Sequence, residues 1–598
     1  MRLISIDAFL RRERSIHLGA QVDRRSRVLE FRDDEATEYA ILSHRWIDPT
    51  EVDCEEMVDL AKMDRQEQDK IRGRLGYKKI VDTCKQAKQD GYEWVWIDTC
   101  CIDKRSSAEL SEAINSMYRW YANANVCYAY LHDVNGPFFT TEKDDEKYCK
   151  SNGWPEWFSR GWTLQEMIAP RNLQFFNKDW QPIGDKKMLS RTLNMITGVP
   201  EDILADGLEG NRPCVAQIIS WAAKRTTTRV EDRAYSLMGL LDVNMPMLYG
   251  EGKKAFHRLQ LEIIRVSSDQ SIFAWRHYSG SVRIGSILAD DPNFFEDCSN
   301  MVLLDHDDFI RQFPQSSIDA DHLGVFPITN RGIQIWMPLC RYRDSNSIFR
   351  AYLPCRTYGG LVSIDLVLYN SNCHRYPSMR YANLENSPAE FRQVYLRYQD
   401  TPNHTITFDV DDSGIFENGF TCCCMNPASL TGNIMVTLTN ANPFYITIYS
   451  GPERGNDRFA VIFGQCLGLD WVDLALTNDR NASKCCGPDW GLYKASKDGS
   501  SGRLWIRHYR LPESICVVRM YRVAWERSKI RLRMEVFRGS HFQNGLDEWN
   551  AYDVEVNDFL VHVNYIIIIR RKSVILVRTR GVSCCTIHRA NMRRSVCR

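Results

Sequence analysis

The 598-residue sequence lacks a charge bias of either sign. Lysine and arginine together number 76, and aspartate and glutamate also number 76, so the formal net charge at pH 7 is zero. Proteins that attract nucleic acid or anionic membranes through their overall field carry a basic excess. We therefore expect no nucleic-acid partner, and we expect function to reside in local sites.

Long apolar runs and patterned cysteines are also missing. The most apolar run, Tyr565–Ile569, is far shorter than the roughly 20 residues of a membrane span, and residues 1–7 hold no apolar core of a signal peptide. Several of the 21 cysteines are adjacent and none forms a Cys-x-x-Cys pair, which argues against a disulfide framework and a zinc site. We expect a cytoplasmic protein with no membrane span, no metal and no required cofactor.

The first 275 residues show an alternation of strands and helices. The predicted elements are a strand at 39–43, a helix at 77–89, a strand at 93–97, a helix at 109–121 and a strand at 126–131. Such alternation favours right-handed crossovers, so we predict an open, mostly parallel α/β sheet with added helices. Residues 1–35, apart from a strand at Arg2–Ile6, are predicted to be loop-like, and residues 51–75 to be an exposed insertion.

Beyond residue 280 the sequence changes to short β-rich runs separated by Asn, Asp, Gly and Ser. This pattern predicts a largely antiparallel β domain of unknown role over residues 280–565. Residues 566–598 are basic and without periodicity, and we predict a disordered tail there. The expected organisation is thus an α/β domain over 1–275, with its core motifs in 39–265, followed by the β-rich domain and the tail.

Polar clusters follow the three predicted strands of the α/β domain. They are Ser43–Trp46, Asp98–Lys104 and His132-Asp133. The carboxyl ends of parallel strands share one edge of a sheet, and open α/β sheets bind their ligands there. The sequence therefore predicts that these three clusters converge in space.

Five sequence blocks carry a resemblance to a known family. In order and spacing they resemble the fungal heterokaryon-incompatibility (HET) domain: Tyr39–Trp46, Trp96–Lys104, Ser111–Tyr118, Arg160–Glu166 and Arg229–Tyr235. The resemblance spans roughly residues 20–265. It implies a fungal protein of non-self recognition, in which activation of the domain triggers programmed death of the fused cell.

The HET domain in turn resembles Toll/interleukin-1 receptor (TIR) domains, which implies a flavodoxin/TIR-like sheet. The block Trp162–Met167 resembles the Trp-Cys-Leu-Asp-Glu-Leu block of plant TIR domains, whose glutamate is catalytic in cleaving the nicotinamide–ribose bond of NAD. The resemblance carries this catalytic role to Glu166 and makes NAD a candidate substrate.

The residues around Glu166 allow two interpretations. Cleavage of the nicotinamide–ribose bond passes through an oxocarbenium-like state, which a carboxylate beside the ribose stabilises, with Trp162 as an aromatic wall. The same stretch also fits a capping box, Thr163-x-x-Glu166, in which the Glu166 side chain only bonds the Thr163 amide. The sequence leaves both interpretations open.

The strand-end clusters supply candidate NAD-binding residues: Ser43, His44, Arg45, Trp46, Asp98 and Asp103, together with Trp162. The Arg45 guanidinium suits phosphate oxygens. In the alternative interpretation, Arg45 forms an ion pair with Asp98 or Asp103 that fixes the sheet edge. Cys100-Cys101 with His44 as base would suit thiol catalysis, but cysteines beside a buried strand are usually core residues.

Two functions from different classes follow. The first is an incompatibility effector that consumes NAD, acts as a glycohydrolase and is active when domains cluster. The second is a non-enzymatic adaptor that signals through self-association of the HET domain. Both imply an upstream protein partner that the sequence does not identify.

Overall fold

The structure is a computed structural model that divides the chain into two compact units. The first comprises Met1–Tyr278, Leu288–Ile328 and Leu353–Val362, and the second comprises Ser279–Ile287, Thr329–Tyr352 and Ser363–Arg598. The residues that the structure describes are 1–20, 27–47, 49–208, 210, 212–276, 285–315, 318, 320–342, 348–369, 371–376, 384, 388–399, 405–417, 419–422, 433–438, 444–451, 458–466, 469–476, 514–522, 529–538, 563–570 and 573–577.

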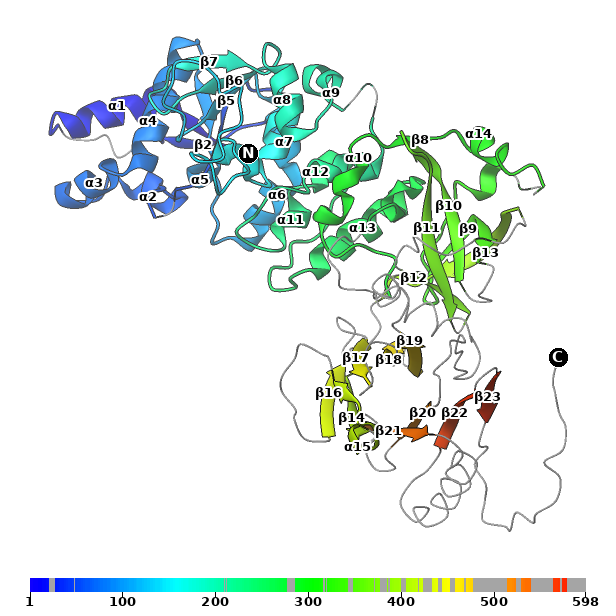
Figure 1. The fold of residues 1–598 in the computed structure, drawn as a ribbon. Coiled ribbons are helices and arrows are strands. Elements are labelled where there is room, and N and C mark those ends of the chain that lie inside the picture. The colour runs from blue at the N-terminus through cyan, green and yellow to red at the C-terminus, as the bar shows by residue number, and fades with distance from the viewer. Residues whose placement is uncertain are drawn as a thin grey trace. The chain divides into compact units, whose positions relative to one another are not determined.

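A seven-stranded sheet forms the centre of the first unit, in the order β2-β1-β4-β3-β5-β6-β7 (Figure 1). Its strands are β1 (Arg2–Ser5), β2 (Leu29–Phe31), β3 (Ala40–His44), β4 (Trp94–Trp96), β5 (Val126–Tyr130), β6 (Leu173–Phe176) and β7 (Pro182–Asp185). Strands β4, β3, β5 and β6 are parallel, and β1, β2 and β7 pair antiparallel at the two edges. The predicted α/β sheet is thus confirmed for its parallel core, and the strands at its two edges are antiparallel.

The order of the four parallel strands places a switch point between β3 and β5. Along the chain they are second, first, third and fourth, which is the order of doubly wound flavodoxin-like sheets. From β3 the chain moves to β4 on one side and then returns to β5 on the other. Ligands of such sheets bind outside the carboxyl ends of the strands at this point. The residues that follow β3 and β5 therefore occupy the position where a site is expected.

The helices of the first unit, including its 3₁₀ turns η1 to η4, are α1 (Ile6–His17), α2 (Cys54–Asp59), α3 (Arg65–Arg72), α4 (Leu75–Gln89), α5 (Asp98–Cys101), α6 (Ser107–Asn123), η1 (Glu156–Ser159), α7 (Thr163–Ile168), α8 (Ser190–Thr197), α9 (Glu201–Asp206), α10 (Val215–Ser220), α11 (Asp232–Tyr235), α12 (Met238–Leu241), α13 (Lys254–Val266), η2 (Gln270–Phe273), η3 (Pro292–Cys298), α14 (His306–Ile310) and η4 (Ala320–His322). Helices α4 and α6 confirm the two predicted crossover helices. Gly91 follows α4 with a φ of +90°, a conformation that favours glycine just after a helix.

Two expectations for the amino-terminal residues are wrong. Residues 1–35 contain the twelve-residue helix α1, which buries Phe9 and Ile16, and residues 51–75 contain α2 and α3. Charged residues dominate these segments, but the helices bury apolar side chains that stand among them, such as Met57 and Ile71. The segment predicted to be an exposed insertion is therefore a folded part of the unit.

Aromatic side chains fill the core between the parallel strands and α6. The ring of Trp96 on β4 lies 5.6 Å from that of Trp120 and 5.8 Å from that of Tyr121. All five residues of β3 are buried. A strand that is buried on both faces belongs at the centre of a parallel sheet, and β3 lies there. Strand β3 ends at His44.

The second unit is built of β-strands, as predicted. The strands that follow residue 300 are β8 (Val302–Leu303), β9 (Ile333–Arg341), β10 (Ile348–Thr357), β11 (Gly360–Tyr369), β12 (Asn372–Tyr376), β13 (Glu390–Leu396), β14 (Ile406–Asp412), β15 (Thr421–Cys422), β16 (Asn433–Leu438), β17 (Phe444–Ser450), β18 (Arg458–Cys466), β19 (Leu469–Leu476), β20 (Ser514–Arg522), β21 (Lys529–Arg538), β22 (Val563–Arg570) and β23 (Ser573–Val577). The short helix α15 (Ser413–Glu417) lies between β14 and β15. Most pairings are antiparallel; β12–β13 and β14–β21 are parallel. The predicted tail contains most of β22 and all of β23, and residues 578–598 lie outside the described residues.

The predicted boundary near residue 275 falls close to Tyr278, where the first segment of the first unit ends. The first unit also takes in Leu288–Ile328, because this segment packs back onto the helices. Ala289 exchanges hydrogen bonds with Gln260 of α13, and Asp291 pairs with Arg233 at 3.0 Å. Among the described residues, no helix combines the length and apolar character needed to cross a bilayer.

Candidate functional site

The side chains at the end of β3 lie alternately on the two faces of the sheet. Successive residues of an extended strand point to opposite faces, and this alternation continues from Ser43 through Trp46. Ser43 and Arg45 contact residues of η1, whereas His44 and Trp46 lie beside Asp98. We call these the Glu166 side (Ser43, Arg45, Trp157 and Glu166) and the His44 side (His44, Trp46, Glu51 and Asp98). The predicted cluster is thus divided between two sites.

Three side chains on the Glu166 side form a hydrogen-bonded chain. The Trp157 indole donates to Ser43 Oγ at 2.8 Å, and the Ser43 hydroxyl donates to Glu166 Oε2 at 2.5 Å. The Glu166 carboxyl is only 3% exposed, and Trp157 is fully buried. The indole ring is also held by Phe158 and Phe175, at centroid distances of 4.9 and 5.7 Å. Glu166 is therefore enclosed at the carboxyl end of β3.

The capping-box interpretation of Glu166 is wrong. Helix α7 has no side-chain cap, and the Thr163 hydroxyl donates instead to the Trp157 carbonyl at 2.5 Å. Burial, aided by the nearby Asp98 charge, raises the pKa of Glu166 to about 8. The Ser43 hydrogen bond and the positive charges of Arg160 and Arg225 act in the opposite direction. At neutral pH this carboxyl is largely protonated.

Arg225 is a buried residue near Glu166 that the sequence interpretation did not single out. Its guanidinium is buried, and Nη1 donates to the Arg160 carbonyl at 2.9 Å and to Thr163 Oγ1 at 3.0 Å. Burial lowers its pKa to about 9, and the Glu166 charge partly restores it. Thr163 stands one turn before Glu166 on α7, so Arg225 is fixed next to the helix that carries the carboxyl. An arginine between Lys224 and the polar run Thr226–Thr228 gave no sequence signal of this burial.

The His44 side holds a second buried polar group. His44 Nε2 lies 3.8 Å from Glu51 Oε2 and 3.8 Å from Asp98 Oδ1. Glu51 Oε1 accepts a hydrogen bond from Lys79 at 2.6 Å, and Asp98 Oδ2 accepts one from the Trp46 indole at 2.8 Å. Burial lowers the pKa of His44 well below its usual value and raises that of Asp98 to about 6. Glu51 was missed because it lies in the stretch predicted to be an insertion.

The ends of β3 and β5 meet through Glu156 of η1. Glu156 Oε2 lies 2.9 Å from Arg45 and 3.4 Å from His132, and the Glu156 amide donates to Asp133 at 2.9 Å. Together with the contacts of Asp98, this confirms that the three strand-end clusters converge. The alternative ion pair of Arg45 with Asp98 or Asp103 is wrong, because Arg45 pairs with Glu156.

The side chains of Asp103 and Trp162 make their polar contacts outside these two groups, although the Glu166 amide donates to the Trp162 carbonyl at 3.4 Å. Asp103 pairs with the exposed Arg105 at 3.0 Å, and Trp162 is hydrogen-bonded to Asp232. Cys100 and Cys101 are buried, and burial raises the pKa of the Cys100 thiol well above its usual value. An un-ionised, enclosed thiol is a poor nucleophile, which agrees with the core interpretation of this pair.

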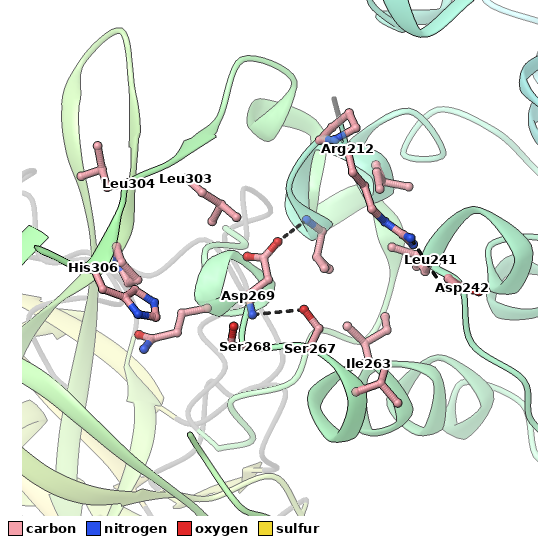
Figure 2. Close-up of a pocket in the computed structure, with 16 residues that line it drawn as sticks. Arg212, Leu241, Asp242, Ile263, Ser267, Ser268, Asp269, Leu303, Leu304 and His306 are labelled. Carbon is pink, nitrogen blue, oxygen red and sulfur yellow. Dashed lines mark hydrogen bonds and ion pairs between the residues drawn. The ribbon is translucent and has the colours of Figure 1, made fainter. Parts of the chain in front are cut away.

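A separate cavity of about 390 Å³ lies between α10, α13 and the segment that follows β8 (Figure 2). Its lining includes Val215, Ile263, Asp269 and His306, and none of the predicted site residues. The Asp269 carboxylate is already bound by the amides of Val215 and Ser271, at 2.6 and 2.8 Å. Within the described part of the chain, no three His, Cys, Asp or Glu side chains are arranged to hold a metal ion.

The fold and the site together define the class of the first unit. It is a doubly wound α/β domain that carries buried ionisable groups at its switch point. Residues 39–151 match the family model of the heterokaryon incompatibility protein (HET). The match includes β3, β4, β5 and the His44 side; Glu166 and Arg225 lie beyond it. Residues 254–285 match a domain of unknown function, DUF8212.

One curated relative is the vegetative incompatibility protein HET-E-1 of Podospora anserina. It is 44% identical over 231 residues, which are 38% of this chain and 16% of that protein. The chain thus spans only a small part of the length of this relative. No solved structure matches the chain.

Proposed function

We propose that this protein is an effector of fungal heterokaryon incompatibility, and that its HET domain triggers death of the fused cell. The family match over residues 39–151 and the identity to a vegetative incompatibility protein support the first part. The chemistry of the Glu166 side supports a specific reaction, which is cleavage of NAD at the nicotinamide–ribose bond.

The observation that carries this reaction is the position of Glu166. Its carboxyl is held by Ser43 at the switch point of the sheet rather than used as a helix cap. Loss of nicotinamide leaves positive charge on the ribose, and an ionised Glu166 beside that sugar would stabilise it. In the closed conformation burial keeps the pKa of Glu166 at about 8, so the ionised form that this role requires is favoured only when the carboxyl meets solvent, with Arg160 and Arg225 acting in the same direction. The groups we assign to NAD are Glu166 for the chemistry and Arg45 for a phosphate.

The proposal requires the domain to open. Glu166 is 3% exposed, and the fully buried Trp157 stands against Ser43, so NAD reaches the carboxyl only after η1 has moved. The described conformation then corresponds to a resting state. Activation by clustering of HET domains supplies a reason for such movement, because an enclosed enzyme that kills its own cell must stay inactive until it is triggered.

The test measures nicotinamide release from NAD by the purified full chain fused to an oligomerising domain. We expect release by the wild-type protein, and at least a hundredfold less by Glu166→Gln, a change that keeps the size and an acceptor for Ser43. The matched control is Glu112→Gln on the exposed face of α6. Wild-type protein that is folded, clustered and inactive would overturn the enzymatic proposal.

The burial of Glu166 favours a second candidate function, a non-enzymatic adaptor that signals through HET-domain self-association. A carboxyl that is enclosed and bonded by Ser43 is also what a structural residue requires. In that case Glu166→Gln still kills cells, whereas a charge reversal on the surface of α6, Glu112→Arg, blocks killing. Cell death scored for these two variants, with folding checked by circular dichroism, separates the two functions.

A further inference from the structure

Four buried polar atoms on the His44 side have no hydrogen-bond partner among the residues that the structure describes. They are Nδ1 and Nε2 of His44, Oε2 of Glu51 and Oδ1 of Asp98. Nε2 and the two carboxylate oxygens face one another, since Nε2 lies 3.8 Å from each oxygen. His44 is 5% exposed, and burying such groups without partners costs about 1–3 kcal/mol each. Because several such groups lie together here, we infer that they bind a ligand rather than serve packing alone.

The charges around this group identify what it can bind. The Glu51 and Asp98 carboxylates face the ammonium groups of Lys79, at 2.6 Å from Glu51, and of Lys104, which acts on Asp98. Because these charges already balance, a divalent cation would leave an uncompensated positive charge in a buried site. The free atoms are mainly acceptors, so they call for a neutral ligand that donates hydrogen bonds. Adjacent hydroxyl groups fit this description.

Trp46 contacts this group through Asp98 and is held by few interactions. Its side chain is 42% exposed, its indole donates to Asp98 Oδ2 at 2.8 Å, and the Lys104 ammonium lies 3.7 Å from its ring centroid. An exposed cation–π contact is worth only about 0.5–1 kcal/mol. The indole N–H thus occupies the position of a hydroxyl donor on Asp98, at the surface of the domain.

We propose that the His44 side is a subsite for the vicinal hydroxyls of a ribose, with Glu51 and Asp98 accepting their hydrogen bonds after Trp46 swings outward. Acidic residues just beyond a parallel strand bind ribose in other doubly wound sheets, and Asp98 follows β4 in the same way. His44 Nε2 accepts or donates the third hydrogen bond. The ligand class is therefore a ribonucleotide.

This inference extends the proposed function, because NAD contains two riboses and Glu166 lies on the other side of β3. A dinucleotide that crosses the sheet edge at the switch point places one ribose on each side. The hydroxyl-binding role concerns affinity alone, so its failure and the failure of NAD cleavage are separate results.

The experiment measures binding of adenosine monophosphate and of its 2′,3′-dideoxy form to the full chain by calorimetry. The protein carries Glu166→Gln, which removes the proposed chemistry. We expect the dideoxy form to bind roughly 10- to 100-fold more weakly, because it leaves the buried carboxylates without donors. Asp98→Asn and Glu51→Gln should each abolish this difference. Asp103→Asn, in the same motif but paired on the surface with Arg105, should preserve it.

A fluorine label on Trp46 reports the outward movement, and its resonance should shift with the ribose form only. Equal affinities for the two nucleotides, or no binding of either by folded protein, would overturn the subsite. Thermal unfolding of each variant shows that the protein is folded. Nicotinamide release by the wild-type chain is scored separately, so a catalytic enzyme without diol selectivity refutes this inference and leaves the proposed function standing.

Discussion

The two sides of the β3 end differ in how firmly they are closed. On the Glu166 side the covering residue is Trp157, which is fully buried and packed against Phe158 and Phe175. On the His44 side the cover is Trp46, which is 42% exposed and held by one hydrogen bond and one cation–π contact. Ser43 and Trp157 are hydrogen-bonded on the first side, whereas four buried polar atoms of the second have no hydrogen-bond partner among the described residues. The difference indicates that the Glu166 side is firmly closed and that the His44 side is more loosely covered.

The strongest test of this difference is to replace each tryptophan with alanine. Trp157→Ala empties a core position, so we expect the free energy of unfolding to fall by about 3–5 kcal/mol. Trp46→Ala removes only surface contacts and should cost about 1–2 kcal/mol. Chemical denaturation of the full chain measures both values. Equal losses would show that the two covers are packed alike.

The second test uses the pKa of Glu166, which burial raises from 4.5 to about 8. Because the pKa is raised in the folded state, the protonated carboxyl contributes its full stabilisation of the fold below pH 4.5. That stabilisation is lost as the pH rises through about 8. Within this window the wild-type free energy of unfolding should fall by up to about 1.4 kcal/mol per pH unit relative to Glu166→Gln. Denaturation curves collected from pH 4.5 to 8 give the difference between the two proteins. A constant difference across the window would mean that Glu166 ionises normally.

The smallest effect is expected at the rim of the Glu166 side. Arg45 and Glu156 form an ion pair whose side chains are 32% and 26% exposed. Pairs of this kind contribute about 0.2–1 kcal/mol and are screened by salt. Arg45→Gln should therefore lower stability slightly in dilute buffer and hardly at all in 1 M salt. A loss that persists at high salt would place this pair in the closed core with Trp157.

Part of this comparison was available in the sequence. The alternation of strands and helices predicted the parallel sheet, and the strand-end clusters predicted convergence at one edge. The period of two along Ser43, His44, Arg45 and Trp46 would also have separated the two sides, since neighbouring residues of a strand face opposite ways. Treating the four residues as one loop concealed that separation.

Other features depend on contacts that no local pattern records. Glu51 and Met57 sit among charged residues, and their partners are distant in sequence: Met57 contacts Arg12 of α1, and Glu51 pairs with Lys79 of α4. Arg225 stands 59 positions after Glu166 in the sequence, and its approach to α7 follows from the path of the chain between them. The choice between a helix cap and a strand-end carboxyl for Glu166 was likewise decided by Ser43, which lies on another element.

The strand β1 has a consequence for how copies of this domain can join. It covers the edge of β4 through the pairs Ile4–Val95 and Ser5–Trp94. If β1 is displaced, the aromatic strand Trp94–Trp96 becomes an open edge that can accept the β1 of a second copy, which is the geometry of a domain swap. In the single chain, β1 therefore closes the β4 edge of the sheet and is itself covered by β2.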